Sequence, residues 1–518
     1  MTISSIQKLK PPFQAGIIDI GAHSVRLEIF QIDKEGNEET LERLSQNLNL
    51  GYDVFRRGEI SSKNMNLLCD ILKEFAQKLD EYGVSYYRAV ATSAVREAFN
   101  RDILINRVKV STGLNVEILE PSEETRILFT LMRQQVRKAI PDFDNINALA
   151  FAIGSGSMLI MFSENGKLMF GESAALGTVR FFDEFGRYEL NPDKIIDLID
   201  SYDLKARFPE SCIKGEKPLA LIGMGASVRA LIGIKQKISE MEVIQFEPSE
   251  LHCIMDEICD LTPEELVTKF HIPDVLALSI KPCGHILSYF LRNMNCSQLI
   301  FPGISTRSAL INDMSRTGKD PFEEDLIFIA ENIGQKYNYE ADHAKCVTAI
   351  SLKIFDKLQK IYGLSNRARM LLQVAGLLHD VGRFVDTRKH HKHSHYLISN
   401  AQIPGLTDRE QNLVAVIVRY HRKALPRTSH LEYTSLPPED KVKVSKLAAI
   451  LRVADALDRA HQDKFKNVSV EVSSNRLLLK IPVYEDLSIE SVYLKKKGDL
   501  FRDVFGLKIR LEEELHKL

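Results

Sequence analysis

The sequence holds a histidine–aspartate pair whose side chains could bind a divalent metal ion. His379 and Asp380 end an apolar segment, LLQVAGLLHDVG, which is expected to be helical. His343 lies upstream in EADHAKCVTAISLKIF, and Asp455 lies downstream in LAAILRVADALDRAH. Imidazole nitrogens and carboxylate oxygens suit a first-row divalent ion, and helices would hold them in an all-α pocket. The sequence therefore predicts a metal site made of these four residues.

Further histidines follow this pair and could extend the site to two metal ions. We favour His391 and His421 as the additional ligands. Two ions would clamp and activate water against a phosphorus centre. The order of a histidine, a His-Asp pair and a later aspartate resembles the ligand set of HD metal phosphohydrolases. A solvated loop is the alternative for the histidine-rich segment, whose members are His390, His391, His393 and His395.

The segments around these histidines are rich in arginine and lysine. In a chain with a formal net charge of −2, such clustering would focus an electric field on a polyanion. Polyphosphate, a nucleoside polyphosphate or RNA would each fit, and a solvated loop face is the alternative. No specific nucleic-acid partner is expected from the chain as a whole. The basic residues are Arg383, Arg388, Lys389, Lys392, Arg419, Arg422, Lys423 and Arg427.

Three glycine- and serine-containing turns, each directly after an apolar strand, form a second set of candidate binding residues. Glycine lets a ligand approach the backbone closely, and exposed N–H groups form a nest for anions. Asp19, at the end of the first of these strands, could hold a cation or water. Ordinary tight turns are the alternative, but three of them suit two lobes that cradle a chain of phosphates. The candidate phosphate-binding residues in these turns are Gly21, His23, Ser24, Gly154, Ser155, Gly156, Ser157, Gly225 and Ser227.

These turns lie in a region where strands and helices alternate. Residues 15–33 and 147–162 each indicate a strand, a turn and a second strand, which suggests a duplicated lobe. Residues 62–82 and 93–112 are expected to be helical. Such alternation favours an α/β architecture. From about residue 323 the pattern becomes helical, and the tail at 467–482 reverts to a hairpin.

Composition limits the class of protein. Apolar residues make up 44% and charged residues 27% of the 518 residues, as is typical of globular proteins. The seven cysteines include no CxxC pair, so neither a disulfide framework nor a cysteine zinc site is supported. The N-terminus lacks an apolar signal core, and no run approaches the roughly 20 apolar residues of a membrane span. We expect a cytoplasmic protein with no membrane partner.

An ordered series of motifs makes the chain recognisable. IIDIGAHSVRL, VATSAVREAFNR, SEETRILF, AIGSGS, ESAALGTVRFF and IGMGAS, followed by LLHDVGRF, resemble the long form of the exopolyphosphatase/guanosine pentaphosphate phosphohydrolase (Ppx/GppA) family. The resemblance implies an actin-like (ribonuclease H-like, ASKHA) α/β half with two lobes. It also implies an all-α HD-type domain and a small α+β tail. The expected domains are residues 1–135 (lobe I), 136–320 (lobe II), 321–465 (HD-type) and 466–518 (tail).

The resemblance also implies an activity and roles for two further residues. Members remove the terminal phosphate from polyphosphate or from the 5′ end of pppGpp with a divalent cation, here Mg or Mn. Fe, Co, Ni or Zn are alternatives at the histidine site. Glu124 would position or activate the attacking water, and Arg96 would grip a phosphate. Helix-start charge is the alternative reading of Glu123-Glu124. A homodimer is expected, because long members pair through their helical regions.

Two departures from the family's motifs bear on catalysis. The second glycine turn normally carries an aspartate and a glutamate, where this chain has Ala152 and Leu159. The N-terminal half therefore keeps Glu124 and Asp19 as candidate catalytic residues, and the sequence leans towards impaired catalysis there. Three hypotheses remain: a hydrolase acting at Glu124, a hydrolase acting at the histidine metals, or a regulatory protein whose altered cleft senses polyphosphate or a nucleotide.

Overall fold

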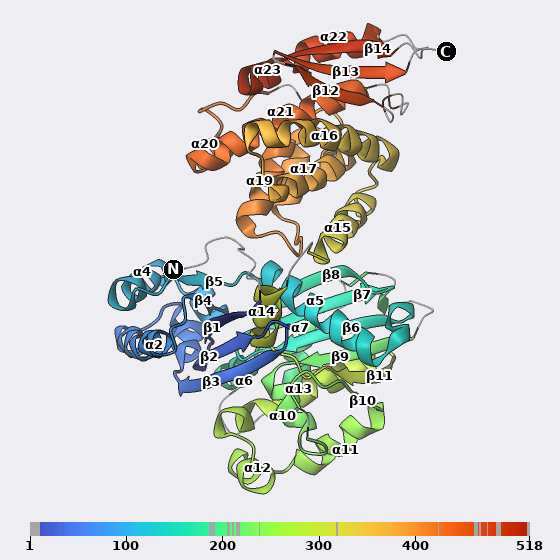
Figure 1. Cartoon of the computed structure of the whole chain (residues 1–518). Coiled ribbons are helices and arrows are strands. Elements are labelled where there is room, and N and C mark those ends of the chain that lie inside the picture. Colours follow the sequence, from blue (N-terminus) through green and yellow to red (C-terminus); the bar gives the residue numbers. More distant parts are fainter. Residues whose placement is uncertain are drawn as a thin grey trace. The chain divides into compact units, whose positions relative to one another are not determined.

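The chain divides into two compact units, residues 1–322 and 323–518, and each is described by itself (Figure 1). Lys423, one of the basic residues noted above, lies outside the described residues. The computed structural model describes residues 11–185, 192–204, 208–209, 212–213, 218–237, 239–316, 320–422, 424–459, 461, 465, 468–473, 475–482 and 488–514.

The first unit contains two mixed sheets of the same order. Strands β3-β2-β1-β4-β5 form one sheet, and β8-β7-β6-β9-β11, with β10 at the β11 edge, form the other. In each, the first three strands are antiparallel and the next two are parallel to the third. The lobe is therefore duplicated, as the glycine turns predicted. The strands are β1 Phe13–Ile20, β2 Ser24–Ile32, β3 Glu38–Asn47, β4 Tyr86–Ala91, β5 Val116–Ile118, β6 Asn147–Ile153, β7 Met158–Glu164, β8 Lys167–Ala174, β9 Leu219–Met224, β10 Ile244–Phe246 and β11 Cys296–Phe301.

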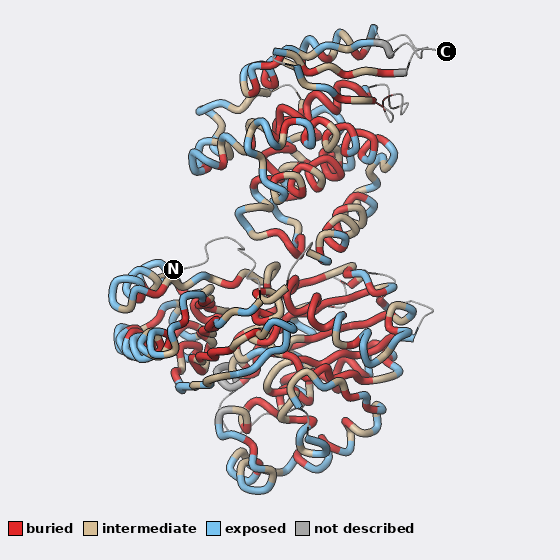
Figure 2. Tube along the Cα trace, in the orientation of Figure 1, coloured by how far each residue is buried: buried red, intermediate tan, exposed pale blue. Residues whose placement is uncertain are grey.

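Helices cover these sheets and leave the central strands buried (Figure 2). Each sheet contributes to an apolar core, one built around Ile18 and Leu27 and the other around Phe151 and Phe290. The helices are α1 Leu50–Arg57, α2 Ser62–Glu81, α3 Ser93–Glu97, α4 Arg101–Thr112, α5 Pro121–Ala139, η1 Pro141–Asn145, α6 Thr178–Phe185, α7 Pro192–Ser201, α10 Ala226–Ile232, α11 Pro248–Ile258, α12 Pro263–Phe270, α13 Asp274–Asn293 and α14 Thr306–Ser315.

The second unit is a helical body with a three-stranded sheet. Strand β13 pairs with β12 antiparallel and with β14 parallel. In the described part of the chain, no helix is both long and apolar enough to cross a membrane. The elements are α15 Phe322–Lys336, α16 Ala341–Tyr362, α17 Asn366–Leu378, η2 Val381–Phe384, α18 His390–Ser399, α19 Asp408–Arg419, α20 Leu431–Thr434, α21 Pro438–Leu457, β12 Ser469–Ser473, β13 Arg476–Pro482, α22 Ser488–Lys497, α23 Asp499–Phe505 and β14 Lys508–Glu514.

Candidate functional site

A cleft of about 470 Å³ in the first unit is lined by all three glycine turns. Asp19 and Glu124, whose relative placement the sequence left open, both line it. Arg96 is not among the lining residues, but its guanidinium lies beside Glu124. The candidate residues that line the cleft are Asp19, Gly21, His23, Ser24, Glu124, Gly154, Ser155, Gly156, Ser157, Gly225 and Ser227.

The first two turns have the same hydrogen bond. The N–H of Gly21 donates to the carbonyl of Ser24 at 2.9 Å, and that of Gly154 donates to the carbonyl of Ser157 at 3.0 Å. In the third turn, Gly225 has a φ of 112°, a conformation that L side chains rarely adopt, and a Cβ there would lie 2.7 Å from the carbonyl oxygen of Ile153. The turns therefore bring bare backbone to the cleft, as a phosphate site requires.

Glu124 lies in the first turn of α5 and is buried. The hydroxyl of Thr306, at the start of α14, donates to its Oε1 at 3.1 Å, and Nη1 of Arg96 lies 4.0 Å from its Oε2. Burial raises the pKa of Glu124, although Arg96 and the Thr306 hydrogen bond act to lower it. A carboxylate with a raised pKa and a polar partner on each oxygen is suited to accept a proton from water near neutral pH.

Asp19, at the end of β1, is the second carboxylate of the cleft. Burial raises its pKa, and the positive charges of Arg26 and Arg307 oppose that shift. Ala152 pairs with Leu159 across β6 and β7, in the place that Asp19 and Arg26 occupy across β1 and β2. Both of these apolar residues line the cleft, so the second lobe presents no carboxylate where the first presents Asp19.

Three arginines of the cleft wall were not among the predicted site residues. Arg26, Arg229 and Arg307 line the cleft. Burial lowers the pKa of Arg229; the charge of Glu240 opposes this shift, and those of Arg307 and Arg26 add to it. Such clustering of positive charge would be relieved by a bound phosphate. Arg26 lies two residues after the first glycine turn, and Arg229 lies two residues after the third. This shared spacing is the sequence pattern from which both arginines could have been predicted.

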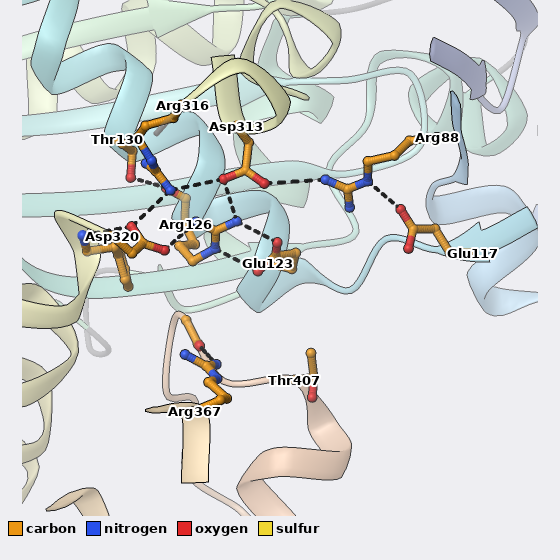
Figure 3. A network of polar contacts seen from close by, with 12 residues as sticks. Arg88, Glu117, Glu123, Arg126, Thr130, Asp313, Arg316, Asp320, Arg367 and Thr407 are labelled. Carbon is orange, nitrogen blue, oxygen red and sulfur yellow. Dashed lines mark hydrogen bonds and ion pairs between the residues drawn. The ribbon is translucent and has the colours of Figure 1, made fainter. Parts of the chain in front are cut away.

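Glu123, next to Glu124, has a structural role. It forms an ion pair with Arg126 at 2.7 Å, and Arg126 also binds Asp313 and Asp320, each at 2.8 Å (Figure 3). Asp313 belongs to α14, the helix that begins with Thr306. The network therefore fixes α5 against α14, and with it the contact between Glu124 and Thr306.

Arg126→Met is expected to destabilise the first unit by about 1.5–3 kcal/mol, because Glu123 would lose its cation while Asp313 and Asp320 keep Arg316. Urea unfolding followed by circular dichroism would measure this. Arg137→Met is the matched control, since its ion pair with Asp144 is solvent-exposed and should cost no more than about 1 kcal/mol. Equal losses for the two variants would contradict the role of Arg126 as a clamp.

The second unit gathers histidines around Asp380. His343, His379 and Asp380 form one group with ligand atoms within 4.8 Å of one another, and Asp380, His390 and His421 form another. Oδ1 of Asp380 lies 3.3 Å from Nε2 of His390 and 3.5 Å from Nε2 of His421. Asp380 is thus shared by two groups, each of metal-ligand composition.

The Nδ1 atoms of three of these imidazoles, which point away from Asp380, donate hydrogen bonds to backbone carbonyls. Nδ1 of His379 donates to the carbonyl of Gly376, and Nδ1 of His421 to that of Val418, both at 2.7 Å. Nδ1 of His390 donates to the carbonyl of Thr387 at 2.9 Å. Because a carbonyl only accepts, each of these Nδ1 atoms carries the proton, and the neutral ring presents a lone pair at Nε2.

The Nε2 atoms, on the side of the rings that faces Asp380, lie close to one another in two pairs. Nε2 of His379 lies 3.2 Å from Nε2 of His343, and Nε2 of His390 lies 3.2 Å from Nε2 of His421. Two lone pairs at this distance would repel each other, and a cation between them or a proton on one ring relieves the repulsion. Burial lowers the pKa of His379 to about 4, whereas the carboxylates of Asp458, Asp455 and Asp380 raise the pKa of His343 against the effect of its burial. The ligand types of both groups, imidazole nitrogens beside a carboxylate, are those that a divalent metal takes.

The structure places His390, and not His391, beside Asp380. Helix α18 begins at His390, and the face that carries His390 and Ser394 is buried. Ser394 donates to the carbonyl of His379 at 2.8 Å, which fixes the rotation of α18. His391 points about 100° away on the helix and belongs to neither group found among the described residues.

Asp455 lies near the first group but has another partner. Its Oδ1 is 3.9 Å from Nε2 of His343, and its Oδ2 is paired with the ammonium of Lys497 on α22. Burial acts to raise the pKa of Asp455, but the charges of Lys497, His421 and His379 together lower the pKa well below its usual range. His343 in turn is oriented by Asp458, whose Oδ2 lies 2.7 Å from its Nδ1.

Comparison with known proteins adds to this geometry. The family model for the Ppx/GppA phosphatase family matches residues 29–314, and the model for Ppx/GppA phosphatase, domain III, matches residues 329–497. The chain is 24% identical over 490 residues to the guanosine-5′-triphosphate,3′-diphosphate pyrophosphatase of Photobacterium profundum, covering 90% of this chain and 91% of that protein.

Among solved structures, an exopolyphosphatase from Cytophaga hutchinsonii is 22% identical, with a TM-score of 0.51, over 58% of this chain and 97% of that one. An Aquifex aeolicus family member is 23% identical, with a TM-score of 0.47, over 58% and 97%. The first unit has the duplicated mixed sheets expected of an actin-like fold. From its matched models and this fold, the chain belongs to the Ppx/GppA phosphatase family.

Proposed function

We propose that this protein is a phosphohydrolase that releases terminal phosphate from inorganic polyphosphate or guanosine polyphosphates in the cleft of its first unit. The observation that carries the proposal is Glu124, a buried carboxylate that lines a cleft built from three glycine turns. The printed names of its relatives, a pyrophosphatase and an exopolyphosphatase, support the same class of reaction.

The carboxylates of the cleft fit a magnesium-type ion. Mg²⁺ is usually bound through one or two carboxylates together with substrate phosphates, and Asp19 and Glu124 supply two. Such an ion would neutralise charge that develops on the phosphoryl oxygens. The use of a metal ion is a prediction, and so is the impairment of catalysis by Ala152 and Leu159. The rate of phosphate release with and without added metal tests both.

The residues of the chain account for the remaining steps. Backbone N–H groups of the turns and the guanidinium groups of Arg26, Arg229 and Arg307 bind phosphate oxygens. Glu124 accepts a proton from water as the water oxygen forms a bond to the terminal phosphorus. The bridging P–O bond breaks, and its electron pair leaves with the shortened phosphate chain. Thr306 and Arg96 hold the Glu124 carboxylate in place throughout.

The direct test is phosphate release by the purified full chain from polyphosphate and from pppGpp, with Mg²⁺ or Mn²⁺. We expect release from at least one of them. If neither substrate nor common nucleotides yield phosphate, the proposal fails and the chain acts as a binding protein.

Arg96→Met should move the acidic limb of the pH–rate profile to higher pH. Glu124 acts as a base only when ionised, and Arg96 lowers its pKa. Without Arg96 the pKa rises, so activity is lost at a higher pH on acidification and recovers towards alkaline pH. Initial rates of phosphate release between about pH 5 and 9 would show the shift. An acidic limb that stays at the same pH in Arg96→Met would show that Arg96 does not set the pKa of Glu124.

A second candidate function is supported by the second unit. We propose that it is an HD-type domain whose histidine cluster binds one or two ions of Mn, Fe, Co, Ni or Zn and hydrolyses a phosphate ester. The support is the convergence of imidazole Nε2 atoms on Asp380. His343, His379, Asp380, His390 and His421 would hold the metal, with Asp455 beside them. A bound ion of this kind lowers the pKa of water so that it attacks phosphorus at neutral pH.

A further inference from the structure

A pocket of about 930 Å³ in the second unit opens onto the histidine cluster. Asp380, His390 and His421 form part of its wall, so the inner side of the cluster faces this pocket. Its volume is in the range of sites that bury a small organic ligand, roughly 300–1,000 Å³. The pocket therefore has room for a ligand of nucleotide size next to the candidate metal ligands.

The pocket wall is strongly positive. Among the described residues it carries seven arginines and lysines against two aspartates, in a chain whose formal net charge is −2. Both aspartates are engaged, Asp380 by the histidines and Asp455 by Lys497. Arg388, Arg422, Arg459 and Lys496 form no ion pair with a carboxylate within the part of the chain that the structure describes. This excess charge selects an anion, and planar guanidinium groups match phosphate oxygens.

Helix α22 supplies one side of the pocket, and none of its residues was among the predicted site residues. It contributes Tyr493, Lys496 and Lys497, about 40 residues after Asp455. Its C-terminal end is fixed by Arg452, a fully buried arginine that donates to the carbonyl of Lys497 at 3.4 Å and to that of Tyr420 at 2.9 Å. The same arginine thus links α22 to Tyr420, the residue directly before His421.

An aromatic ring lies on this basic side. The guanidinium carbon of Arg459 is 5.2 Å from the ring centre of Tyr493, and the ammonium of Lys496 is 5.7 Å from it. A partly exposed ring flanked by cations offers a stacking face for a base and charges for its phosphate.

We propose that this pocket binds a phosphate ester with an aromatic base, such as a nucleoside monophosphate, its phosphate towards the histidine cluster and its base against Tyr493. The inference rests on the second candidate function and deepens it by naming the substrate class. The pocket is distinct from the cleft of the first unit, whose proposed ligand is a chain of phosphates.

A tryptophan at position 493 would report on this pocket alone, because the chain contains no tryptophan. Tyr493→Trp keeps an aromatic face, and its fluorescence would be titrated with AMP, adenosine and ribose 5-phosphate on metal-free protein. We expect a saturable change with AMP and none with adenosine. Ribose 5-phosphate should bind at least about fivefold more weakly than AMP, because it lacks the stacking base.

In the same background, Arg459→Gln with Lys496→Gln should weaken AMP binding about tenfold or more, since two charged donors are lost. Lys495→Gln is the matched control: it lies on α22, is exposed and does not line the pocket. No saturable change with AMP, an unaltered affinity in the double variant, or a response only to oligoribonucleotides would overturn the proposal. The capacity to bind metal is measured separately on the parent protein, so a parent that binds AMP but takes up none of the offered metals would sink the second candidate function and leave the pocket standing.

Discussion

Glu124→Gln is expected to lower the rate of phosphate release at least about a hundredfold, the lower end of what general base catalysis contributes. The substitution keeps the size of the side chain, and the amide oxygen still accepts the hydrogen bond from Thr306. What it removes is the group that takes the proton from water. Because Glu124 is buried, no exposed carboxylate replaces it readily. The measurement is steady-state phosphate release from polyphosphate and pppGpp, with thermal unfolding to confirm that the variant is folded.

Glu123→Gln is the matched control for this prediction. Glu123 directly precedes Glu124 in the sequence, but the Glu123 carboxylate contacts Arg126 and does not line the cleft. We expect its turnover to stay within a few-fold of the parent, with some loss of stability. If Glu124→Gln retains the parent's rate while His379→Ala abolishes it, the histidine cluster of the second unit is the source of phosphate release.

Asp380→Ala is expected to weaken metal binding in the second unit at least about a hundredfold. Even residues that only orient metal ligands typically account for 10–100-fold in affinity, and Asp380 is the carboxylate that both candidate groups share. Its loss would leave four imidazoles without the negative charge that offsets a divalent ion. Elemental analysis of protein purified with Mn²⁺, followed by calorimetric titration, would measure the effect.

His390→Ala and His391→Ala distinguish the ligands. The two residues are adjacent on α18, yet only His390 lies beside Asp380 and His421. We expect His390→Ala to lose one ion and His391→Ala to keep the parent's metal content. The reverse result would mean that α18 is rotated relative to the structure, and retention of metal by Asp380→Ala would reject the cluster as a metal centre.

Much of the site was predictable from the sequence because its signals are local. A glycine turn between two apolar strands determines its own backbone geometry, and the same hydrogen bond closes the turns at Gly21 and Gly154. The apolar segment that ends in His379 and Asp380 likewise determines a buried helix end. These patterns, in their order along the chain, were sufficient to predict the family, the duplicated lobe and the three glycine turns that line the cleft.

Tertiary structure decided the features that depend on contacts between distant segments. Thr306 reaches Glu124 across 182 positions, and no local pattern encodes that pairing. The choice of His390 over His391 depends on the rotation of α18, which its packing against the His379 backbone sets. Lys497 meets Asp455 only because α22 folds back onto the histidine cluster. Residue types and spacing identify groups capable of chemistry, but burial and long-range packing decide which of them face one another.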